Sequence, residues 1–433
     1  MGPILLALVL AVLAWVLVVG DLVRRHRPAW HWYLVGYPVT VCRVLTTWRK
    51  VTILNDLAVS KRPPRGLLGD LMVKGDPLRP ITPRLSFPRA TRLGLTVMVR
   101  LHAGQTPATY MKAADALVHA WKVHAVRVTS PERGTVLLTA MASDPLERPG
   151  LASAPAELLS ALIGALETGG AWVMNLRLMP HWLIAGATRS GKSTLLARLI
   201  TQLAPQPVAL VGIDCKGGME LGLFAGRLSA LATCRREAVG VLSALVVDMQ
   251  DRMQTCRAAG VRSIWELPDP LRPIPVVVIV DEIAELYLSD GTREGRTEAE
   301  QCSTLLLRLA QLGAALGLHL VVAGQRVGSD LGPGVTALRA QLSGRICHRV
   351  NDPGTAEMAL GDLNKDAVAV AQAITPDERG VAVCTGPDGG WSRARSHLTP
   401  TEEAVAITKK YAATTPTLPA LHGAVEVLEG DDK

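Results

Sequence analysis

The sequence predicts an α/β protein, in which a large domain with a mainly parallel sheet follows a small α+β domain and an N-terminal transmembrane helix. Three observations predict this. Apolar strand candidates alternate with helical stretches after about residue 151, a shorter strand–helix–strand pattern precedes them, and the chain opens with twenty uncharged residues. At 433 residues the chain has room for two or three folded units.

The first twenty residues, MGPILLALVLAVLAWVLVVG, form the predicted transmembrane helix (1–20). A helix of this length rises about 30 Å, which crosses the hydrocarbon core of a membrane. Arg24, Arg25 and Arg27 follow it and no basic residue precedes it, so we expect a cell-membrane protein whose remainder is cytoplasmic. A cleaved signal peptide is the competing interpretation, but it lacks support because a basic start and a small-residue cleavage site are both missing.

Residues 21–64 are predicted to be a juxtamembrane or interfacial segment that ends in a linker. Within it, the stretch Trp30–Trp48 is apolar with aromatic ends, but His31, Pro38 and Arg43 interrupt it. Aromatic ends suit a membrane interface. Two interpretations therefore stay open, a second short membrane span and an ordinary packed segment.

Residues 65–150 are predicted to form the small α+β domain. The stretch 93–104 alternates apolar and polar residues as a strand does, and 106–123 has the apolar spacing of a helix. Strand character resumes at 125–130 and at 134–141.

Residues 151–395 are predicted to form the large domain. Nearly continuous hydrophobic strands that alternate with helices argue for a parallel sheet covered on both faces. The strand candidates are 182–186, 207–214, 273–281, 317–324, 344–350 and 380–386. Residues 396–433 are expected to contain one helix, at 399–413, and a mobile acidic tail.

Charge and cysteine usage restrict the class of protein. The net charge of +8 suggests a polyanionic partner, either nucleic acid or anionic lipid. The seven cysteines are scattered and form no CxxC pair or Cys/His cluster. The sequence therefore indicates neither a zinc site nor a disulfide framework.

The motif GATRSGKS follows a strand candidate and opens a helix candidate, which is the context that a Walker A phosphate loop requires. Its glycines let backbone N–H groups turn toward phosphates, and the helix N-terminus adds positive charge. Lys192 is expected to reach the β- and γ-phosphates, and Ser193 to bind Mg²⁺. The predicted ATP-binding residues are Gly186, Ala187, Thr188, Arg189, Ser190, Gly191, Lys192, Ser193 and Thr194.

The stretch PVVVIVDEIAEL supplies the matching Walker B carboxylates. Asp281 at the strand end is expected to bind Mg²⁺ together with Ser193. Glu282 is the candidate general base toward water. Adjacent Asp-Glu is typical of motors that hydrolyse ATP, and no guanine-specific motif is found, so ATP and Mg²⁺ are the expected cofactors.

Several further motifs, taken in order, resemble the FtsK/SpoIIIE family of membrane-anchored DNA translocases. The resemblance covers about residues 90–390. It implies a RecA-like P-loop motor domain at 151–395 and places Asp214, Lys216 and Glu220 on the family's Asp-x-Lys…Glu-Leu positions. The motifs are MPHWLIAGATRSGKSTLL, IDCKGGMELGLF, GVRSI at 260–264, RLAQLGAALGLHLVVAGQR and LRAQLSGRICHRV.

A narrower resemblance is to the actinobacterial plasmid conjugative transfer proteins. It depends on the stretch 33–64 and on the charged insert DGTREGRTEAEQ at 290–301. Two positions depart from the family pattern, since Ala314 replaces an arginine and Gly324 replaces the threonine of Thr-Gln-Arg. Gln325 then remains the candidate γ-phosphate sensor. The residues after the motor are too few for the DNA-reading winged-helix domain of relatives.

The resemblance implies a homo-oligomeric ring, expected to be a hexamer, with ATP bound between subunits and an arginine supplied by the neighbour. Arg345 is the first candidate for this arginine, followed by Arg308, Arg326 and Arg339. The segment 289–296 is a candidate pore loop, and a solvated charged loop is its alternative.

Together these features predict a membrane-anchored, oligomeric ATPase that translocates double-stranded DNA, in conjugative transfer together with other conjugation proteins. Two alternatives are a chromosome-partitioning DNA translocase and a secretion-system ATPase that moves protein. A third is a DNA- or membrane-binding regulator that binds ATP as a switch without hydrolysing it. Intact Lys192, Asp281 and Glu282 argue against the switch.

Overall fold

The computed structural model of the protein describes residues 28–61, 79–147, 157–289, 291–361, 363, 365–386 and 389–421. The chain divides into two compact units, Met1–Glu147 and Arg148–Lys433. The predicted transmembrane helix at 1–20 lies outside the described residues. Within the described ranges, no helix combines the length and the apolar character that crossing a membrane requires.

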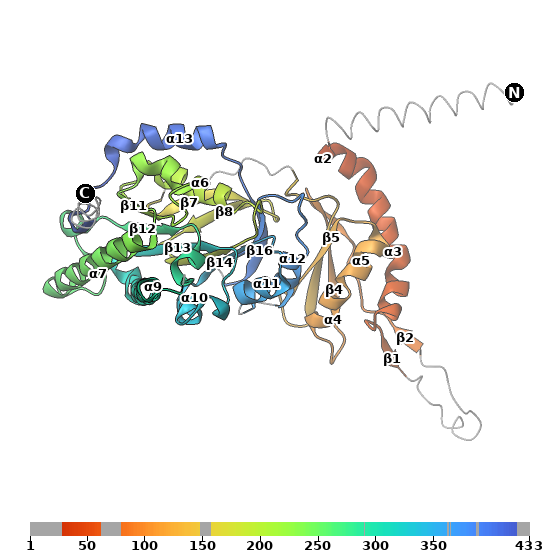
Figure 1. Ribbon diagram of the computed structural model, residues 1–433. Coiled ribbons are helices and arrows are strands. Elements are labelled where there is room, and N and C mark those ends of the chain that lie inside the picture. The colour runs from red at the N-terminus through yellow and green to blue at the C-terminus, as the bar shows by residue number, and fades with distance from the viewer. Residues whose placement is uncertain are drawn as a thin grey trace, which may run out of the picture. The chain divides into compact units, whose positions relative to one another are not determined.

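The first unit contains a four-stranded antiparallel sheet in the order β3-β4-β6-β5, with helices packed on it (Figure 1). Its sheet strands are β3 (Arg89–Ala90), β4 (Gly94–Arg100), β5 (Ala125–Thr129) and β6 (Thr135–Met141), and a separate pair is β1 (Val59–Lys61) with β2 (Arg79–Ile81). Its helices are α2 (Pro28–His31), the π-helix η1 (Trp32–Gly36), α3 (Tyr37–Leu54), α4 (Pro107–Lys112) and α5 (Ala114–Trp121).

The stretch Trp30–Trp48 is a packed part of this unit. Val41, Val44 and Trp48 recur every three or four residues on α3 and are buried in the same core cluster as the sheet and α5. The Trp48 indole donates to the carbonyl oxygen of Pro83 at 3.0 Å. The structure thus favours the packed segment over a second span. The first unit therefore includes helices in the region that was predicted to be a juxtamembrane segment.

The helix predicted at 106–123 is divided in two. Ala113 separates α4 from α5, and Lys122 ends α5 with a left-handed backbone, φ 55°. Both pieces still bury their apolar residues, since Tyr110, Leu117 and Trp121 are in the core.

The second unit contains a ten-stranded sheet in the order β11-β10-β12-β13-β9-β14-β15-β16-β7-β8. Neighbours from β11 to β14 are parallel, and neighbours from β14 to β8 are antiparallel. The strands are β7 (Ser160–Leu166), β8 (Ala171–Asn175), β9 (His181–Ala185), β10 (Ala209–Ile213), β11 (Ala230–Ala232), β12 (Val276–Val280), β13 (Leu318–Gly324), β14 (Gly344–His348), β15 (Val381–Thr385) and β16 (Trp391–Ser396).

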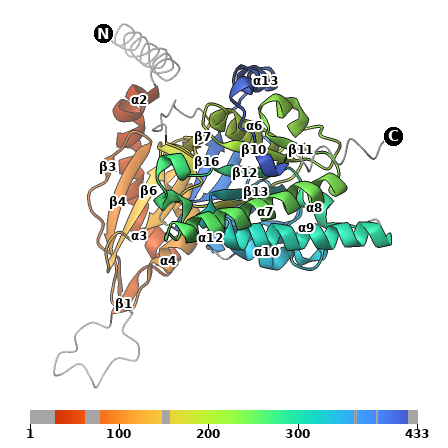
Figure 2. The ribbon, with the colours of Figure 1, turned by 90° about the vertical axis from the view of Figure 1, so that its left-hand side faces the viewer.

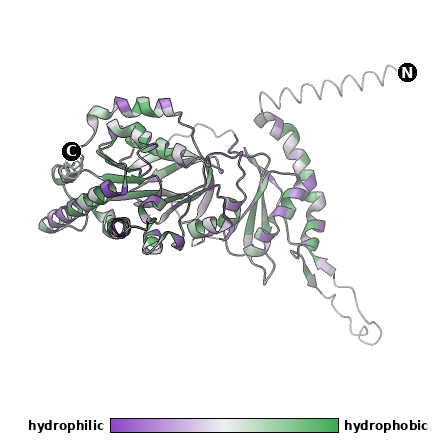
Figure 3. Cartoon of the chain, viewed as in Figure 1, coloured by the Kyte–Doolittle hydropathy of each residue, from purple (hydrophilic) through white to green (hydrophobic). Residues whose placement is uncertain are grey.

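Helices cover both faces of the parallel half (Figure 2). One core cluster joins the sheet to α7 (Arg235–Ala258) and α9 (Arg293–Leu312), and the other joins it to α6 (Lys192–Leu203) and η3 (Leu221–Arg227). Successive residues of β12 alternate between the two clusters, as a strand buried on both faces requires. Figure 3 shows the hydrophobic colour concentrated in the strands, with mixed colour on the long helices.

The remaining helices of this unit are short. They are η4 (Ile264–Glu266), η5 (Asp269–Leu271), α8 (Ile283–Tyr287), η6 (Ala314–Leu316), η7 (Ser329–Leu331), α10 (Val335–Gln341), α11 (Pro353–Leu360), α12 (Lys365–Gln372), α13 (Thr401–Lys410) and η8 (Ala412–Thr414).

All six predicted strands are present, but the antiparallel half of the sheet was largely missed. β7 is apolar but consists mainly of alanine, leucine and glycine, and β16 carries arginines and serines, so neither has the β-branched composition that favours a buried strand. The stretch 380–386 forms β15 as predicted, but it pairs antiparallel with β14. The acidic tail from residue 422 lies outside the described residues.

Candidate nucleotide site

The phosphate loop connects β9 to α6, and its tight backbone requires glycine at two positions. Gly191 has φ 119°, a value that favours glycine, and Arg189 adopts φ 61°. A Cβ at Gly191 would lie 2.7 Å from the Cα of Gly380, so only glycine fits this crossing. Gly186 is crowded as well, because a Cβ added at this position would lie 2.6 Å from the Ser190 hydroxyl oxygen.

Lys192 points from the start of α6 toward the Walker B residues. Its Nζ donates to the backbone carbonyl oxygen of Asp281 at 2.6 Å. It also lies 3.5 Å from Asp281 Oδ1 and 3.5 Å from Glu282 Oε2. The three side chains are each less than 10 % exposed. The structure therefore brings together the lysine and both carboxylates that the sequence singled out.

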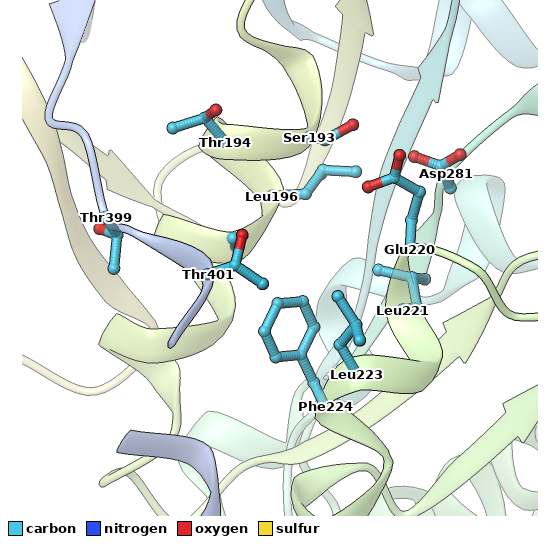
Figure 4. A pocket seen from close by; sticks show the side chains of 11 residues that line it. Ser193, Thr194, Leu196, Glu220, Leu221, Leu223, Phe224, Asp281, Thr399 and Thr401 are labelled. Atoms are coloured by element: carbon cyan, nitrogen blue, oxygen red, sulfur yellow. The ribbon is translucent and has the colours of Figure 1, made fainter. Parts of the chain in front are cut away.

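The residues at this point fit a nucleotide with Mg²⁺. Asp281 Oδ1 and Glu282 Oε2 are buried and accept no hydrogen bond from any described residue. In this structure lysine ammonium groups lie beside these oxygens, and carboxylate oxygens are also ligands that Mg²⁺ takes. The Ser193 hydroxyl faces the same space as Asp281 and Glu220 (Figure 4). Ser193 and Asp281 are thus placed to share a metal ion.

Lys216 is a second cation at the Walker B carboxylates. Its Nζ lies 3.4 Å from Asp281 Oδ2 and 3.6 Å from Glu282 Oε2. Burial lowers the pKa of Lys216, but Asp281 and Glu282 more than offset this, so the net pKa is raised. Lys216 therefore stays protonated beside the two carboxylates.

Asp214 holds the loop that carries Lys216. It follows β10, is 1 % exposed and accepts from the backbone N–H groups of Glu220 and Leu221 at 2.8 and 3.0 Å. The family resemblance marked Asp214, Lys216 and Glu220 without giving them roles. The geometry assigns Asp214 to positioning and places Lys216 on the Walker B pair.

Gln325 joins the phosphate loop to Glu282. Its backbone N–H donates to Glu282 Oε1 at 3.1 Å, and its side-chain Oε1 accepts from the Thr188 hydroxyl at 3.4 Å. The structure also explains Gly324. A Cβ there would lie 2.7 Å from Ile283 Cγ2 and 3.1 Å from Glu282 Oε1, so a threonine would displace the carboxylate.

Arg345, the first candidate for the arginine supplied to a neighbouring subunit, is buried within its own unit. It is on β14, 6 % exposed, and donates to the carbonyl oxygen of Arg339 at 2.7 Å. A side chain buried in its own unit does not reach another subunit's nucleotide. Arg339 is half-buried and bonded to the Val327 carbonyl oxygen, whereas Arg308 and Arg326 are exposed.

Two other expectations change with the structure. The candidate pore loop at 289–296 is only partly a loop, because α9 begins at Arg293 with Thr292 as its N-cap. Ala314 precedes β13, while Gln325 follows it. Position 314, where the family pattern has an arginine, therefore lies at the end of β13 opposite to this nucleotide site.

His348 and Arg349 belong to the site; they lie in the motif LRAQLSGRICHRV, but the sequence analysis gave them no role. His348 ends β14 beneath the phosphate loop, where its Cβ crowds Gly186. Burial, opposed by a hydrogen bond to the Val381 carbonyl oxygen and supported by nearby Lys192, lowers the pKa of His348 to about 4. Arg349 donates to the carbonyl oxygen of Thr188 at 3.0 Å. The pairing of β14 with β9 brings these residues to the loop, so the motif that contains them did not by itself indicate a role at the nucleotide site.

Comparison with known proteins identifies both units. Residues 152–271 and 266–329 match the FtsK/SpoIIIE family, and residues 17–142 match the N-terminal domain of actinomycete conjugal transfer proteins. The transfer protein TraSA of Streptomyces ambofaciens is 42 % identical over 351 residues, which cover 78 % of this chain and 84 % of TraSA.

Two further comparisons extend this result. The DNA translocase FtsK of Listeria monocytogenes is 32 % identical over 235 residues, which are 48 % of this chain and 30 % of FtsK. The structure of the pCW3 conjugation coupling protein TcpA with ATPγS aligns with a TM-score of 0.57 at 20 % identity, over 84 % of this chain and 98 % of TcpA. That likeness establishes a shared P-loop ATPase fold.

Proposed function

The chain belongs to the FtsK/SpoIIIE family, and from this membership and the geometry of the nucleotide site we propose that it is a membrane-anchored, ring-forming ATPase that translocates double-stranded DNA in conjugative transfer. One observation carries the proposal. The buried Lys192, Asp281 and Glu282 meet at one site, where Gln325 donates to Glu282, and the same chain carries an N-terminal domain of the conjugal transfer type.

Each side chain has a task in hydrolysis. Lys192 binds the β- and γ-phosphates, and Ser193 with Asp281 would hold Mg²⁺, which would neutralise charge on the phosphates. Glu282 accepts a proton from the attacking water. The backbone N–H of Gln325 fixes the Glu282 carboxylate, and its side chain lies against the phosphate loop.

Lys216 supplies one of the two positive charges that balance the carboxylates of this site. Two lysines face two carboxylates, so the cluster is neutral before a nucleotide enters. When Lys192 turns to the phosphates, Lys216 remains to compensate Glu282. This arrangement keeps buried like charges from repelling one another.

The test of the proposed function is ATP turnover by the full-length protein in detergent, with linear duplex DNA, with single-stranded DNA and without DNA. We expect strong stimulation by the duplex alone, abolished in Lys192→Ala. If the assembled protein hydrolyses ATP at the same rate with and without DNA, this result would contradict DNA translocation and favour a protein-transport ATPase.

Anchoring and assembly have their own test. Deletion of residues 2–20 is expected to move the protein from the membrane fraction to the soluble fraction, because this stretch is the proposed anchor. In the presence of ATP, the protein that lacks residues 2–20 is expected to form a hexameric ring. Mass photometry measures the number of subunits. Persistent membrane association without the stretch would contradict the anchor, and a monomer at all concentrations would contradict the ring.

A further inference from the structure

The positive charge of the chain is concentrated in its first unit. Met1–Glu147 contains 19 of the 46 Lys and Arg residues but only 8 of the 38 Asp and Glu residues, so its net charge is +11. The second unit, Arg148–Lys433, has a net charge of −3. A polyanionic partner is therefore attracted mainly to the first unit.

The four-stranded sheet of this unit is covered by helices on one face. Leu95, Val97 and Val99 of β4 are fully buried in the core cluster that includes α3 and α5, and Figure 1 shows both helices on the same side of the strands. The residues between them, Thr96 and Met98, point to the opposite face, because side chains alternate along a strand. Thr96 is half-buried and Met98 is 43 % exposed.

We call this opposite face the open sheet face. Its composition is basic and hydroxylic, and none of the four strands contains an Asp or Glu residue. The polar strand residues that form it are Arg89, Arg100, Arg127, Thr96, Thr135 and Thr139.

The strand register arranges these side chains in rows. Arg89 pairs with Thr96, Thr96 with Thr139, and Thr139 with Arg127. An arginine thus stands at each end of a row that crosses all four strands, a span of ~14 Å at the usual spacing between strands. Arg100 lies four residues beyond Thr96 on the same face of β4, and both Arg89 and Arg100 are exposed.

This composition fits the backbone of duplex DNA. Arginine side chains and threonine hydroxyls donate hydrogen bonds to phosphate oxygens. Met98 and Leu137 pair between the arginines and offer apolar contact to deoxyribose. The four strands contain no aromatic residue, so they offer no stacking surface to the bases of a single strand.

Anionic lipid is the other polyanion to consider, but the side chains that suit it lie elsewhere in the unit. Trp30, Tyr33 and Leu34 are 62 %, 44 % and 67 % exposed. They belong to α2 and η1, which lead directly into α3 and so into the helical layer. Aromatic and apolar side chains of this kind favour a membrane interface. The open sheet face is on the other side of the sheet from α3.

We propose that the open sheet face of the first unit binds the sugar–phosphate backbone of duplex DNA. This contact lies outside the nucleotide-binding unit and rests on the proposed function of DNA translocation. Phosphate contacts position DNA but carry no sequence information, so duplexes of different sequence should bind equally well.

The test is binding of a short fluorescent duplex to the full-length protein in detergent with ATPγS, measured by anisotropy over a range of salt concentrations. The double variant Arg89→Gln/Arg100→Gln removes two charges from the open sheet face. Arg49→Gln/Lys50→Gln is the matched control, because it removes the same charge from two exposed positions of α3. Thermal unfolding and mass photometry check that both variants fold and assemble as the wild type does.

We expect the slope of log affinity against log salt to become shallower by about 2 in Arg89→Gln/Arg100→Gln, because each lost phosphate contact removes ~0.9. The difference in affinity from the wild type should then grow about tenfold as salt falls from about 0.2 M to about 0.05 M. The control variant should bind the duplex with the affinity and slope of the wild type. ATP turnover without DNA should be unchanged in both variants.

Three results would overturn the proposal. The first is an unchanged slope in Arg89→Gln/Arg100→Gln or an equal change in the control. The second is loss of ring assembly together with DNA binding, which would make this face a contact between subunits. The third is loss of binding to phosphatidylserine vesicles, in protein without residues 2–20, while duplex binding is kept. Wild-type protein whose ATP turnover does not respond to duplex DNA would instead contradict the proposed function.

Discussion

Charged residues have different roles in the parallel and antiparallel halves of the large sheet. In the parallel half, strand ends carry Asp214, Asp281 and Gln325 to one edge, where a buried oxygen of Asp281 accepts no hydrogen bond from the described residues. In the antiparallel half, Arg393 on β16 pairs with Glu167 at 3.2 Å and also with Glu378. Since the carboxyl ends of parallel strands share an edge, buried charge there is available for ligands, whereas charge in the antiparallel half stabilises the fold.

The largest effect is expected from Glu282→Gln. The amide keeps the shape and the hydrogen bond from Gln325 but no longer accepts a proton from water, so turnover should fall about 10²–10⁴-fold, the contribution of a general base. ATP binding should persist. Single-turnover hydrolysis and equilibrium binding measure the two quantities. If the variant hydrolyses ATP at the wild-type rate, Glu282 is not a catalytic residue.

Lys192→Ala should lower turnover about 10²–10³-fold, because one preorganised donor to the transferring phosphoryl group is lost. Unlike Glu282→Gln, this variant should also bind ATP weakly. The measurement is ATP affinity alongside turnover in both variants. Equal ATP affinity in the two would contradict the assigned positions of lysine and glutamate.

Arg393→Met tests the antiparallel half. Arg393 and Glu167 are 6 % and 5 % exposed, and breaking a buried pair leaves one charge uncompensated at a cost of about 3–5 kcal/mol. The free energy of unfolding in urea should fall by that amount, with ATP affinity of the folded fraction retained. If ATP affinity falls while the free energy of unfolding is unchanged, the Arg393–Glu167 pair contributes to the nucleotide site.

His348 marks the boundary between the two halves, on the last parallel strand. Its folded pKa of about 4 lies below the ordinary value of 6.5, so between these pH values the unfolded chain binds a proton that the folded chain does not. Stability should therefore fall as pH drops below 6.5, by about 2 kcal/mol at pH 5. His348→Gln should shrink the pH 7 to pH 5 difference in urea unfolding by that amount; an unchanged difference would assign the acid sensitivity to other groups.

The sequence predicted the site where a short motif coincides with a strand end. The phosphate loop, Asp281 and Glu282 each follow an apolar run, and parallel strands bring their ends together. Gln325 was named, but its bond to Glu282 depends on strand order. The burial of Arg345 could not be predicted, because an arginine in a strand is exposed or buried according to its neighbours. Trp30–Trp48 was ambiguous, since a packed helix and an interfacial segment share aromatic and apolar residues.

The central claim is that hydrolysis at this site moves the protein along duplex DNA. The most direct measurement is displacement of a third strand from a triplex on linear duplex DNA by the full-length protein. We predict displacement that requires ATP, depends on the length of duplex beside the triplex and is absent in Glu282→Gln. Duplex-stimulated ATP turnover by the wild type without any displacement would contradict translocation.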